Sequence, residues 1–508
     1  MPRAPLAALL ALTAIAGCAR GPEDGLARVR RAGVLRWGGD LQGGEPFAYE
    51  DPARPGHLAG FEVEIADALA RALGVRAEFV QNDWSTLVPS LERGTFDVAM
   101  NGLEVTPARA ARVAFTRPYY LFSERLVVRA GAGGARDLAS LRGLRAGTLA
   151  SSQAWELLRA AGAVAVPYEG VDEPFTDLAS GRTDAVLMDD VIVDRYAPRH
   201  GGLRVAADVA EGRYAIAVRP ADASLARALD DALGAMIARG ELRAILARSG
   251  LDNARQERLA AAVAPPAPPA PVRARLDAHQ VALFLRGAAV TIAISTGAMA
   301  LAIALGLALA LARHTLPRVD ASGTASGPPR PTSPADSGRA LAGALATIYV
   351  EVFRGTPVLL QLFVIYYGLA SVLPLPPWLA AILGLGLNYA AYEAEIYRAG
   401  LAAVPRGQLE AAWALGMSTP VALRRVVLPQ ALRIALPGMT NDFIALLKDS
   451  SLVSVITVVE LTKRMTIAAV DLRGWLAPGL LCAALYFAMS YPLSRLARRL
   501  ERRLDGQS

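Results

Sequence analysis

The chain has 508 residues, of which 53% are hydrophobic and 19% charged. It is too long for one ordinary domain and too apolar for a wholly soluble protein, and the same composition excludes a disordered or collagen-like chain. The net charge of +7 suggests a nucleic-acid binder, but residues 1–271 carry 31 basic and 33 acidic side chains, whereas residues 272–508 carry 22 and 13. Because the basic excess belongs to the more hydrophobic half, we expect no nucleic-acid partner.

The N-terminal segment has the features of a secretory signal. Arg3 supplies the charged start, and residues 4–15 form an apolar stretch that is too short to span a bilayer comfortably. Residues 15–18 (IAGC) resemble a bacterial lipobox, in which the cysteine is lipidated after cleavage. We predict a signal peptide with a lipobox over residues 1–18, lipidation of Cys18 and export of the adjoining domain. The alternative is a plain signal or an uncleaved anchor with a chance cysteine.

Residues 25–256 have the composition of a soluble α/β domain. Short apolar runs predict buried strands, and the amphipathic stretches between them predict helices. The strands are expected at 96–100, 185–188 and 215–218, and the helices at 63–73, 154–161 and 225–249. Two lobes of α/β type fit this length.

A linker is expected over residues 257–277. Its centre, residues 260–271, reads AAAVAPPAPPAP, and such sequences adopt an extended polyproline conformation. At about 3.1 Å per residue this spacer would reach roughly 35 Å. A disordered tether is the alternative, and either form would hold the two parts of the chain together.

Residues 278–500 carry membrane signals that predict about five spans. Residues 287–312 and 474–494 are uncharged and long enough to cross about 30 Å of hydrocarbon. Residues 355–392 are uncharged but broken by prolines at 374, 376 and 377, which suits two crossings with a turn between them. A weaker crossing is expected at 434–459, since Pro437 and several charges interrupt it.

The arginine distribution predicts which loops face the cytoplasm. With the first domain outside, the inside segments are 314–354, 398–433 and the tail from Arg495, which ends in a cytoplasmic segment at 501–508. Residues 314–339 read as a flexible insertion. One segment fits poorly, because 448–473 is predicted outside and yet carries four basic residues.

The sequence points to neither a metal site nor a bound nucleotide. Cys18 and Cys482 lie in segments that can hardly meet, and the four histidines lack ligand spacing. Lys448 and Lys463 are the only lysines, and neither stands in a GxxxxGK[ST] loop. We therefore predict no catalytic residues, no metal site and no cofactor bound by this chain.

Two predicted helix starts in the first domain are candidate anion sites. Thr106-Pro107-Ala108-Arg109 places a capping threonine before a proline, and Ser151-Ser152-Gln153 leads into the helix at 154–161. Free N–H groups and the helix dipole favour a carboxylate at such a start, and Arg109 could add a bidentate grip. Each start could equally be a mere cap, with Arg109 exposed.

The first domain resembles the polar amino-acid solute-binding proteins of bacterial ABC transporters. The resemblance covers most of residues 33–250, and it is carried by residues 60–69 (GFEVEIADAL), Trp84, 89–91 (PSL), Gly94, Asp97, 106–109 (TPAR), Phe115, Pro118 and Tyr119. It implies a two-lobed α/β periplasmic-binding-protein domain of type II, with the substrate held between the lobes.

The resemblance also implies a substrate-binding set. The substrate carboxylate would lie on Arg109 and on N–H groups of Glu104 and Gln153, and the ammonium on the Asp189 carboxylate and the Gly102 carbonyl. Trp84 would cover the side chain, and Asp40 would tune the side-chain preference. The full set is Asp40, Trp84, Asn101, Gly102, Glu104, Arg109, Ser152, Gln153 and Asp189.

Glu104 departs from this resemblance, because the family usually has serine or threonine there. Together with Asp40 and Asp189, it favours a cationic or polar amino acid such as arginine, lysine, histidine or glutamine. The alternative is that Glu104 turns away to pair with an arginine.

The second half resembles the polar amino-acid permeases of ABC importers over about residues 281–500. Glu410-Ala411-Ala412, then Gly416, within the loop at 398–433, resembles their EAA loop. Further similar stretches are 353–357 (FRGTP), 392–398 (YEAEIYR), Gly407-Gln408, 426–429 (VVLP) and 448–452 (KDSSL). The residues alone predict a short cytoplasmic helix over 407–415. The resemblance makes that helix the element that docks into a separate ATP-binding subunit.

Together the two resemblances imply a receptor fused to an all-α, five-helix permease in the bacterial inner membrane. This multi-pass, lipid-embedded chain would form a homodimer with two ATPase subunits that use ATP and Mg²⁺, and its binding domain would lie on the extracytoplasmic side. An amino-acid-gated channel is one alternative, but there the spans interrupt the binding domain. A transmembrane sensor would need more than the tail after Arg495, and an enzyme would not need the EAA loop.

Overall fold

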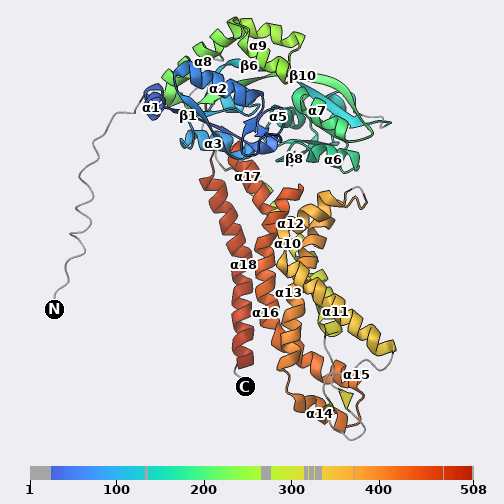
Figure 1. Ribbon diagram of the computed structural model, residues 1–508. Coiled ribbons are helices and arrows are strands. Elements are labelled where there is room, and N and C mark those ends of the chain that lie inside the picture. Colours follow the sequence, from blue (N-terminus) through green and yellow to red (C-terminus); the bar gives the residue numbers. More distant parts are fainter. Residues whose placement is uncertain are drawn as a thin grey trace, which may run out of the picture.

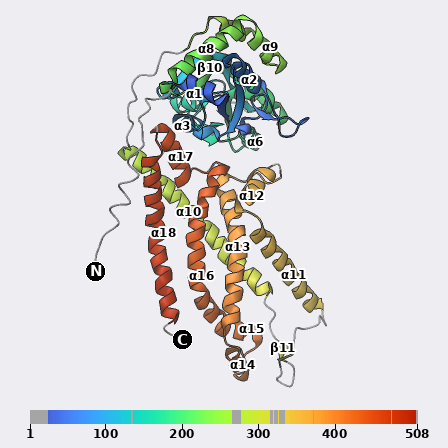
Figure 2. The same cartoon turned by 60° about the vertical axis from the view of Figure 1, so that its left-hand side comes forward.

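A computed structural model describes residues 24–131, 135–264, 276–313, 318–319, 325–326, 334–370, 372–472 and 474–505. The predicted signal peptide with Cys18 lies outside these residues, as do 265–275 of the linker and most of the insertion at 314–339. Two strand pieces of that insertion are described, β11 (Arg318–Val319) and β12 (Ala325–Ser326). Figures 1 and 2 show an α/β domain standing on one end of a helical domain.

The α/β domain is built on one sheet of eight strands in the order β4-β1-β5-β10-β6-β9-β7-β8. Lobe 1 contains β1, β4 and β5, and lobe 2 contains β7, β8 and β9; within each lobe the strands pair in parallel. The long strands β6 and β10 are antiparallel and join the lobes. The bounds are β1 (Val34–Gly39), β4 (Arg76–Gln81), β5 (Val98–Ala99), β6 (Ala114–Arg129), β7 (Arg145–Leu149), β8 (Val164–Tyr168), β9 (Ala185–Asp189), β10 (Leu203–Val218) and, in a separate pair, β2 (Tyr49–Glu50) and β3 (Leu58–Ala59).

Amphipathic helices cover the sheet. In α2, Phe61, Ile65 and Leu69 recur at every fourth position and are buried, which places one apolar stripe against the sheet. The bounds are α1 (Gly25–Ala32), α2 (Phe61–Leu73), α3 (Leu87–Glu92), α4 (Pro107–Ala110), α5 (Gln153–Ala160), α6 (Glu173–Ala179), α7 (Asp190–Tyr196), α8 (Ala223–Ala238) and α9 (Glu241–Arg248). The predicted helix at 225–249 is thus two helices, because Gly240 takes a positive φ of 72° between them.

The receptor domain ends later than the predicted boundary at residue 256. The 3₁₀ helix η6 (Ala254–Ala261) packs onto the sheet, where the Gln256 amide donates to the Leu121 carbonyl at 2.8 Å and Leu259 is buried. Arg258 pairs with Glu211 of β10 at 2.9 Å. The expected start of the linker at 257 is therefore wrong. The charged sequence of this segment hid the few side chains that anchor it.

The second domain consists of long helices. α10 and α13 pack closely through small residues, including buried Ala298, Ala302 and Ala390. The bounds are α10 (Ala278–Arg313), α11 (Pro334–Gly355), α12 (Val358–Phe363), α13 (Pro377–Ala403), α14 (Arg406–Ala414), α15 (Thr419–Ala422), α16 (Leu428–Asp449), α17 (Leu461–Asp471) and α18 (Leu476–Asp505), with π-helical turns at Val364–Gly368 and Leu423–Val427 and a 3₁₀ stretch at Ser450–Ile456.

Two of the described helices are long and apolar enough to cross a bilayer, Ala278–Arg313 and Leu476–Arg499. A third crossing is made if Ala340–Gly355 and Val358–Gly368, which meet at 106°, form one broken span. α13 and α16 are not among these helices, so the predicted count of five spans stays a prediction.

The predicted start of the second span coincides with the end of a helix, and its bounds in the membrane stay a prediction. The sequence places its start at Gly355, with 314–354 as an inside loop, but residues 334–355 already form α11. Because Glu351 and Arg354 are charged, the uncharged stretch of the sequence begins only after them, at Gly355. Pro357, which cannot donate an N–H to a continuing helix, marks the bend rather than the start.

Candidate functional site

A small cavity lies between the two lobes. Six of the predicted substrate-binding residues line it, together with six that sequence reasoning did not select. The lining residues are Asp40, Gly43, Phe47, Trp84, Asn101, Gly102 and Glu104, and on the lobe 2 side Leu149, Glu169, Val171, Asp189 and Ile192. Arg109, Ser152 and Gln153 stand beside this cavity rather than in its lining.

Asp40 organises the lobe 1 wall at the carboxyl end of β1. Its buried carboxylate accepts from the backbone N–H of Trp84 at 2.8 Å and from the Gln81 amide at 3.0 Å. Its own N–H donates to Asn101 Oδ1 at 2.9 Å. Asp40 therefore fixes the position of Trp84, and its predicted effect on side-chain preference stays a prediction.

Gly102 is held in a conformation that a larger residue could not adopt. Its φ is +59°, and a Cβ atom would lie 2.6 Å from the Phe47 ring. Its N–H donates to Glu62 Oε1 at 2.6 Å. Glu62, which also accepts from the Tyr119 hydroxyl, is completely buried, and this burial raises the pKa of Glu62 to about 7. The sequence feature that could have identified Glu62 is the presence of an acidic residue beside the apolar stripe of α2.

Arg109 pairs with Glu104, the alternative left open from the sequence. Thr106 caps α4 by accepting from the Arg109 N–H at 3.3 Å, and the Arg109 guanidinium lies 4.8 Å from the Trp84 ring centroid. Nη1 donates to the Glu104 carboxylate and, at 3.1 Å, to the Glu104 carbonyl. The other Glu104 oxygen accepts from the Gln153 N–H at 3.3 Å. The Glu104 carboxylate thus occupies two of the three donors that the resemblance assigns to the substrate carboxylate.

Hydrogen bonds across the cleft hold the lobes together. Trp84 Nε1 donates to the Ala150 carbonyl at 2.9 Å, and Arg109 Nη2 donates to the Ser151 carbonyl at 2.9 Å. Ser152 acts as a helix cap, because its hydroxyl accepts from the Trp155 N–H at 3.0 Å. The structure describes a closed cleft in which the start of α5 meets lobe 1.

The cavity is lined by carboxylates from both lobes. Asp189 caps α7 by accepting from the Ile192 N–H at 3.0 Å, and its burial raises the pKa of Asp189 to about 8. Glu169 follows β8 and faces Asp40 and Glu104 across the same space. No motif identified Glu169 in the sequence. A positively charged group suits this environment, because it would offset charges that are costly to bury.

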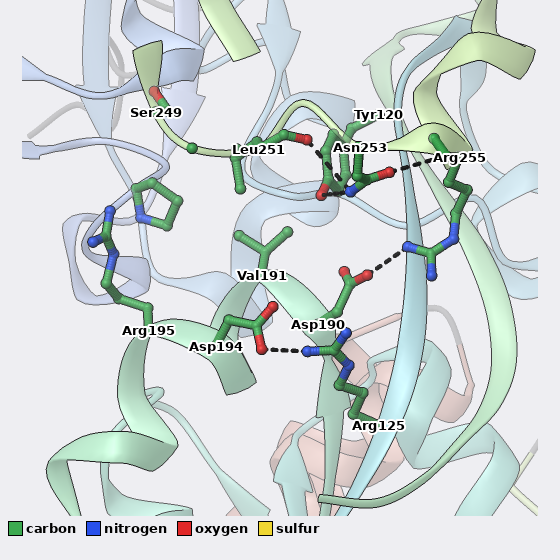
Figure 3. A pocket seen from close by; sticks show the side chains of 13 residues that line it. Tyr120, Arg125, Asp190, Val191, Asp194, Arg195, Ser249, Leu251, Asn253 and Arg255 are labelled. Carbon is green, nitrogen blue, oxygen red and sulfur yellow. Dashed lines mark hydrogen bonds and ion pairs between the residues drawn. The ribbon is translucent and has the colours of Figure 1, made fainter. Parts of the chain in front are cut away.

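A second hollow lies elsewhere on the receptor domain (Figure 3). Four of its charged side chains pair with each other, Arg255 with Asp190 at 2.5 Å and Arg125 with Asp194, and Arg195 pairs with Glu45. The first two pairs tie η6 and α7 to β6. We interpret this hollow as part of the scaffold.

The predicted short helix of the EAA loop is α14, at the end of the helical domain opposite the receptor (Figure 1). Ala412 is buried, and Leu409 packs in a cluster with Leu401 and Val427, whereas Glu410 and Ala411 are exposed. The helix ends before Gly416, whose φ of +79° reverses the chain. α14 therefore presents a small, charged surface at the far end of the molecule.

The comparisons with known proteins match the two domains separately. Bacterial extracellular solute-binding proteins of family 3 match residues 37–250, and the binding-protein-dependent transport system inner membrane component matches residues 337–506. The L-cystine transport system permease protein of Bacillus subtilis is 42% identical over 31% of this chain and 69% of its own length. A probable amino-acid ABC transporter permease of Vibrio harveyi is 38% identical over 32% and 74%.

Solved structures of binding proteins match the first domain. A mutant arginine-binding protein from T. maritima is 25% identical, with a TM-score of 0.42 over 45% of this chain and all of that one. An ancestral arginine-binding protein is 30% identical, with a TM-score of 0.39 over 42% and 97%.

The two family matches agree with the architecture: a two-lobed solute-binding domain is followed by a helical permease domain of the inner membrane. The permease relatives are matched over more than two thirds of their length at identities near 40%. The chain belongs to the amino-acid permeases of binding-protein-dependent ABC transporters, and as a fused receptor and permease it is a transporter subunit of an amino-acid importer.

Proposed function

We propose that this subunit captures a polar amino acid outside the membrane, with a preference for one bearing a cationic side chain, and passes it to its own permease domain. The observation that supports this substrate class is the ring of carboxylates around the cleft cavity: Asp40, Glu104, Glu169 and Asp189. The guanidinium of Arg109, the one positive charge we place at the predicted carboxylate site, is already paired with Glu104.

In this proposal Glu104 has two positions. In the position that the structure describes, its carboxylate lies on Arg109 and on the Gln153 N–H. A bound amino acid would place its own carboxylate on those donors, and Glu104 would turn toward the cationic side chain. The Glu104 carboxylate would then compete with neutral ligands for Arg109, whereas it would pair with the side chain of cationic ligands.

Affinities for a series of amino acids test the substrate class. Isothermal titration of the full-length protein should give tighter binding of arginine and lysine than of glutamine, and no detectable binding of glutamate. The variant E104Q keeps the shape of the side chain but removes its charge, so the preference for arginine over glutamine should fall about tenfold. Equal affinities for arginine, leucine and glutamate in the unmodified protein would contradict the proposed substrate class.

The coupling to ATP hydrolysis is also a proposal. The exposed Glu410 and Ala411 on α14 suit a docking contact with a separate ATP-binding subunit, because small residues allow close approach and Glu410 can pair with a basic side chain. We propose that this partner uses ATP and Mg²⁺, and that two copies of the chain with two such subunits form the transporter. Cross-linking of a cysteine at position 411 to the co-expressed ATPase subunit would test this contact.

We further propose that the receptor domain faces the extracytoplasmic side, as the predicted signal and the arginine-rich C-terminal part of α18 suggest. A membrane-impermeant reagent should label a cysteine introduced in the receptor at Arg54 in intact spheroplasts. The reagent should label a cysteine introduced at Gly407 only after the membrane is permeabilised.

A further inference from the structure

Among the described residues, polar contacts join the receptor to its own permease domain at two places. Figures 1 and 2 show α12 and α17 directly beneath the α/β domain. One contact joins lobe 2 to the π-helical turn after α12, and the other joins the residue after β8 to the first turn of α17.

The first contact is a buried anchor. The Tyr366 hydroxyl donates to Asp177 Oδ2 at 2.5 Å, and Arg182 donates to Asp177 at 2.9 Å and to the Tyr366 carbonyl at 3.0 Å. The Arg182 guanidinium also lies 4.1 Å from the centroid of the Tyr366 ring. Since Asp177 and Arg182 both belong to lobe 2, this contact holds that lobe on the permease.

The second contact is an ion pair between Lys463 and Glu169. Lys463 Nζ lies 2.9 Å from Glu169 Oε1, and the lysine is only 5% exposed. Its position is fixed from the permease side, because the carboxylate of Glu460 accepts from the N–H groups of Thr462 and Lys463, both at 2.7 Å. The lysine therefore projects from a rigid helix start.

α17 stands at the mouth of the cleft. Lys463, Thr466 and Ile467 share a small cavity with Ser85, which follows Trp84 in lobe 1, and with 150–151 and Trp155 of lobe 2. The first turn of α17 is thus next to the residues that close the lobes over the substrate.

Glu169 is common to both sites: it lines the substrate cavity and pairs with Lys463. A single carboxylate cannot offer its full charge to two cations. The Lys463 ammonium and the cationic group of the proposed substrate are of the same chemical class, so they compete for this carboxylate.

We propose that Lys463 is a substrate-release residue. When the receptor is docked on the permease, its ammonium takes Glu169 away from the cationic group of the bound amino acid and lowers the affinity of the cleft for it. Docking and cationic substrate then oppose each other through one side chain, which favours transfer into the permease. This inference rests on the proposed preference for a cationic amino acid.

The test compares arginine and glutamine binding to the full-length protein in lipid nanodiscs. K463M removes the competing charge with little change in size, and we expect it to raise arginine affinity about tenfold, within the usual range of coupling between sites, while glutamine affinity changes less than twofold. K463R keeps the charge and should resemble the unmodified protein. T466V, on the same helix and in the same small cavity, is the matched control and should leave both affinities unchanged.

A second measurement uses Glu169 itself. In the E169Q background, adding K463M should no longer change arginine affinity, because the shared carboxylate is gone. An unchanged or weaker arginine affinity in K463M, or an equal gain in the E169Q background, overturns the inference. The proposed substrate class is judged separately, by whether the unmodified protein prefers arginine to glutamine.

Discussion

At the scale of single residues, the cleft is governed by the placement of charge. Arg109 and Glu104 form a nearly buried pair that spans from α4 to the start of α5 through Ser151 and Gln153. The types of residue could be predicted from the sequence, but the pairing could not, because either carboxylate orientation is compatible with the same residue spacing.

Removal of Arg109 should strongly weaken substrate binding. R109A deletes the proposed partner of the substrate carboxylate, so we expect a loss of about 2–5 kcal/mol of binding free energy in isothermal titration. R112A is the matched control, because Arg112 is close to Arg109 in the sequence but pairs with Glu92. Unchanged binding by R109A, with R112A also unchanged, would refute the role of Arg109.

Asp189 should make binding depend on pH. Burial raises the pKa of Asp189 to about 8, so this carboxyl is mostly protonated at pH 7 in the free receptor. A bound ammonium group favours the ionised form, so binding should release up to about one proton at pH 7, and affinity should rise between pH 6 and 8.

Titrations at pH 7 in buffers of different ionisation enthalpy measure this proton release. D189N should abolish it while keeping the cap of α7, because asparagine caps helices as well as aspartate does. A proton release that persists in D189N would show that another group titrates.

At the scale of elements, small residues determine how the membrane helices pack. Gly306 of α10 faces α13 so closely that a Cβ atom would lie 2.7 Å from Glu393 Cβ and 3.0 Å from the Ala390 carbonyl oxygen. Gly297 also faces α13, but its nearest neighbour is the flexible end of Ile382, at 3.0 Å.

These two glycines should therefore respond differently to substitution. G306V should separate α10 from α13 at a cost of about 1–3 kcal/mol, seen as a lower midpoint of thermal unfolding in detergent. G297A should cost much less, because the Ile382 side chain can turn aside. Similar midpoints for both variants would contradict the close approach at Gly306.

Sequence reasoning missed α17 and η6 for the same reason: few of their side chains show the apolar pattern of a packed helix. α17 is short and contains Lys463 and Arg464, so it reads as part of a basic loop. η6 is anchored mainly by Gln256 and Leu259 among charged neighbours. By contrast, α2 and α10 bury long apolar stripes, and the helix containing Glu410 was predicted from its short run of helix-forming residues.

At the scale of the whole molecule, the receptor and α14 lie at opposite ends of the helical domain (Figure 1). We therefore expect that a mutation can separate substrate binding by the receptor from the proposed coupling at α14. E410K reverses the charge of the exposed α14 surface, and we expect it to abolish uptake of labelled arginine by cells while leaving arginine binding to the same purified variant unchanged. Normal uptake by E410K would contradict the coupling role.

The overall plan of the molecule followed from the sequence because each half has its own pattern: alternating short strands and helices in one, long apolar helices in the other. The contacts between the halves did not follow. Glu169 and Lys463 are almost three hundred residues apart, and Arg182 and Tyr366 stand in no shared motif, so only the folded structure brings them together.

The anchor between lobe 2 and Tyr366 determines which part of the receptor can swing. Because Asp177 and Arg182 bind lobe 2 to Tyr366, we expect the cleft to open by movement of lobe 1, through bending of the long strands β6 and β10. Lobe 1 would then move relative to a lobe 2 that stays fixed on the permease. In the proposed transport cycle, the released amino acid would stay above the permease during opening, so geometry would set the direction of delivery before the proposed partner hydrolyses ATP.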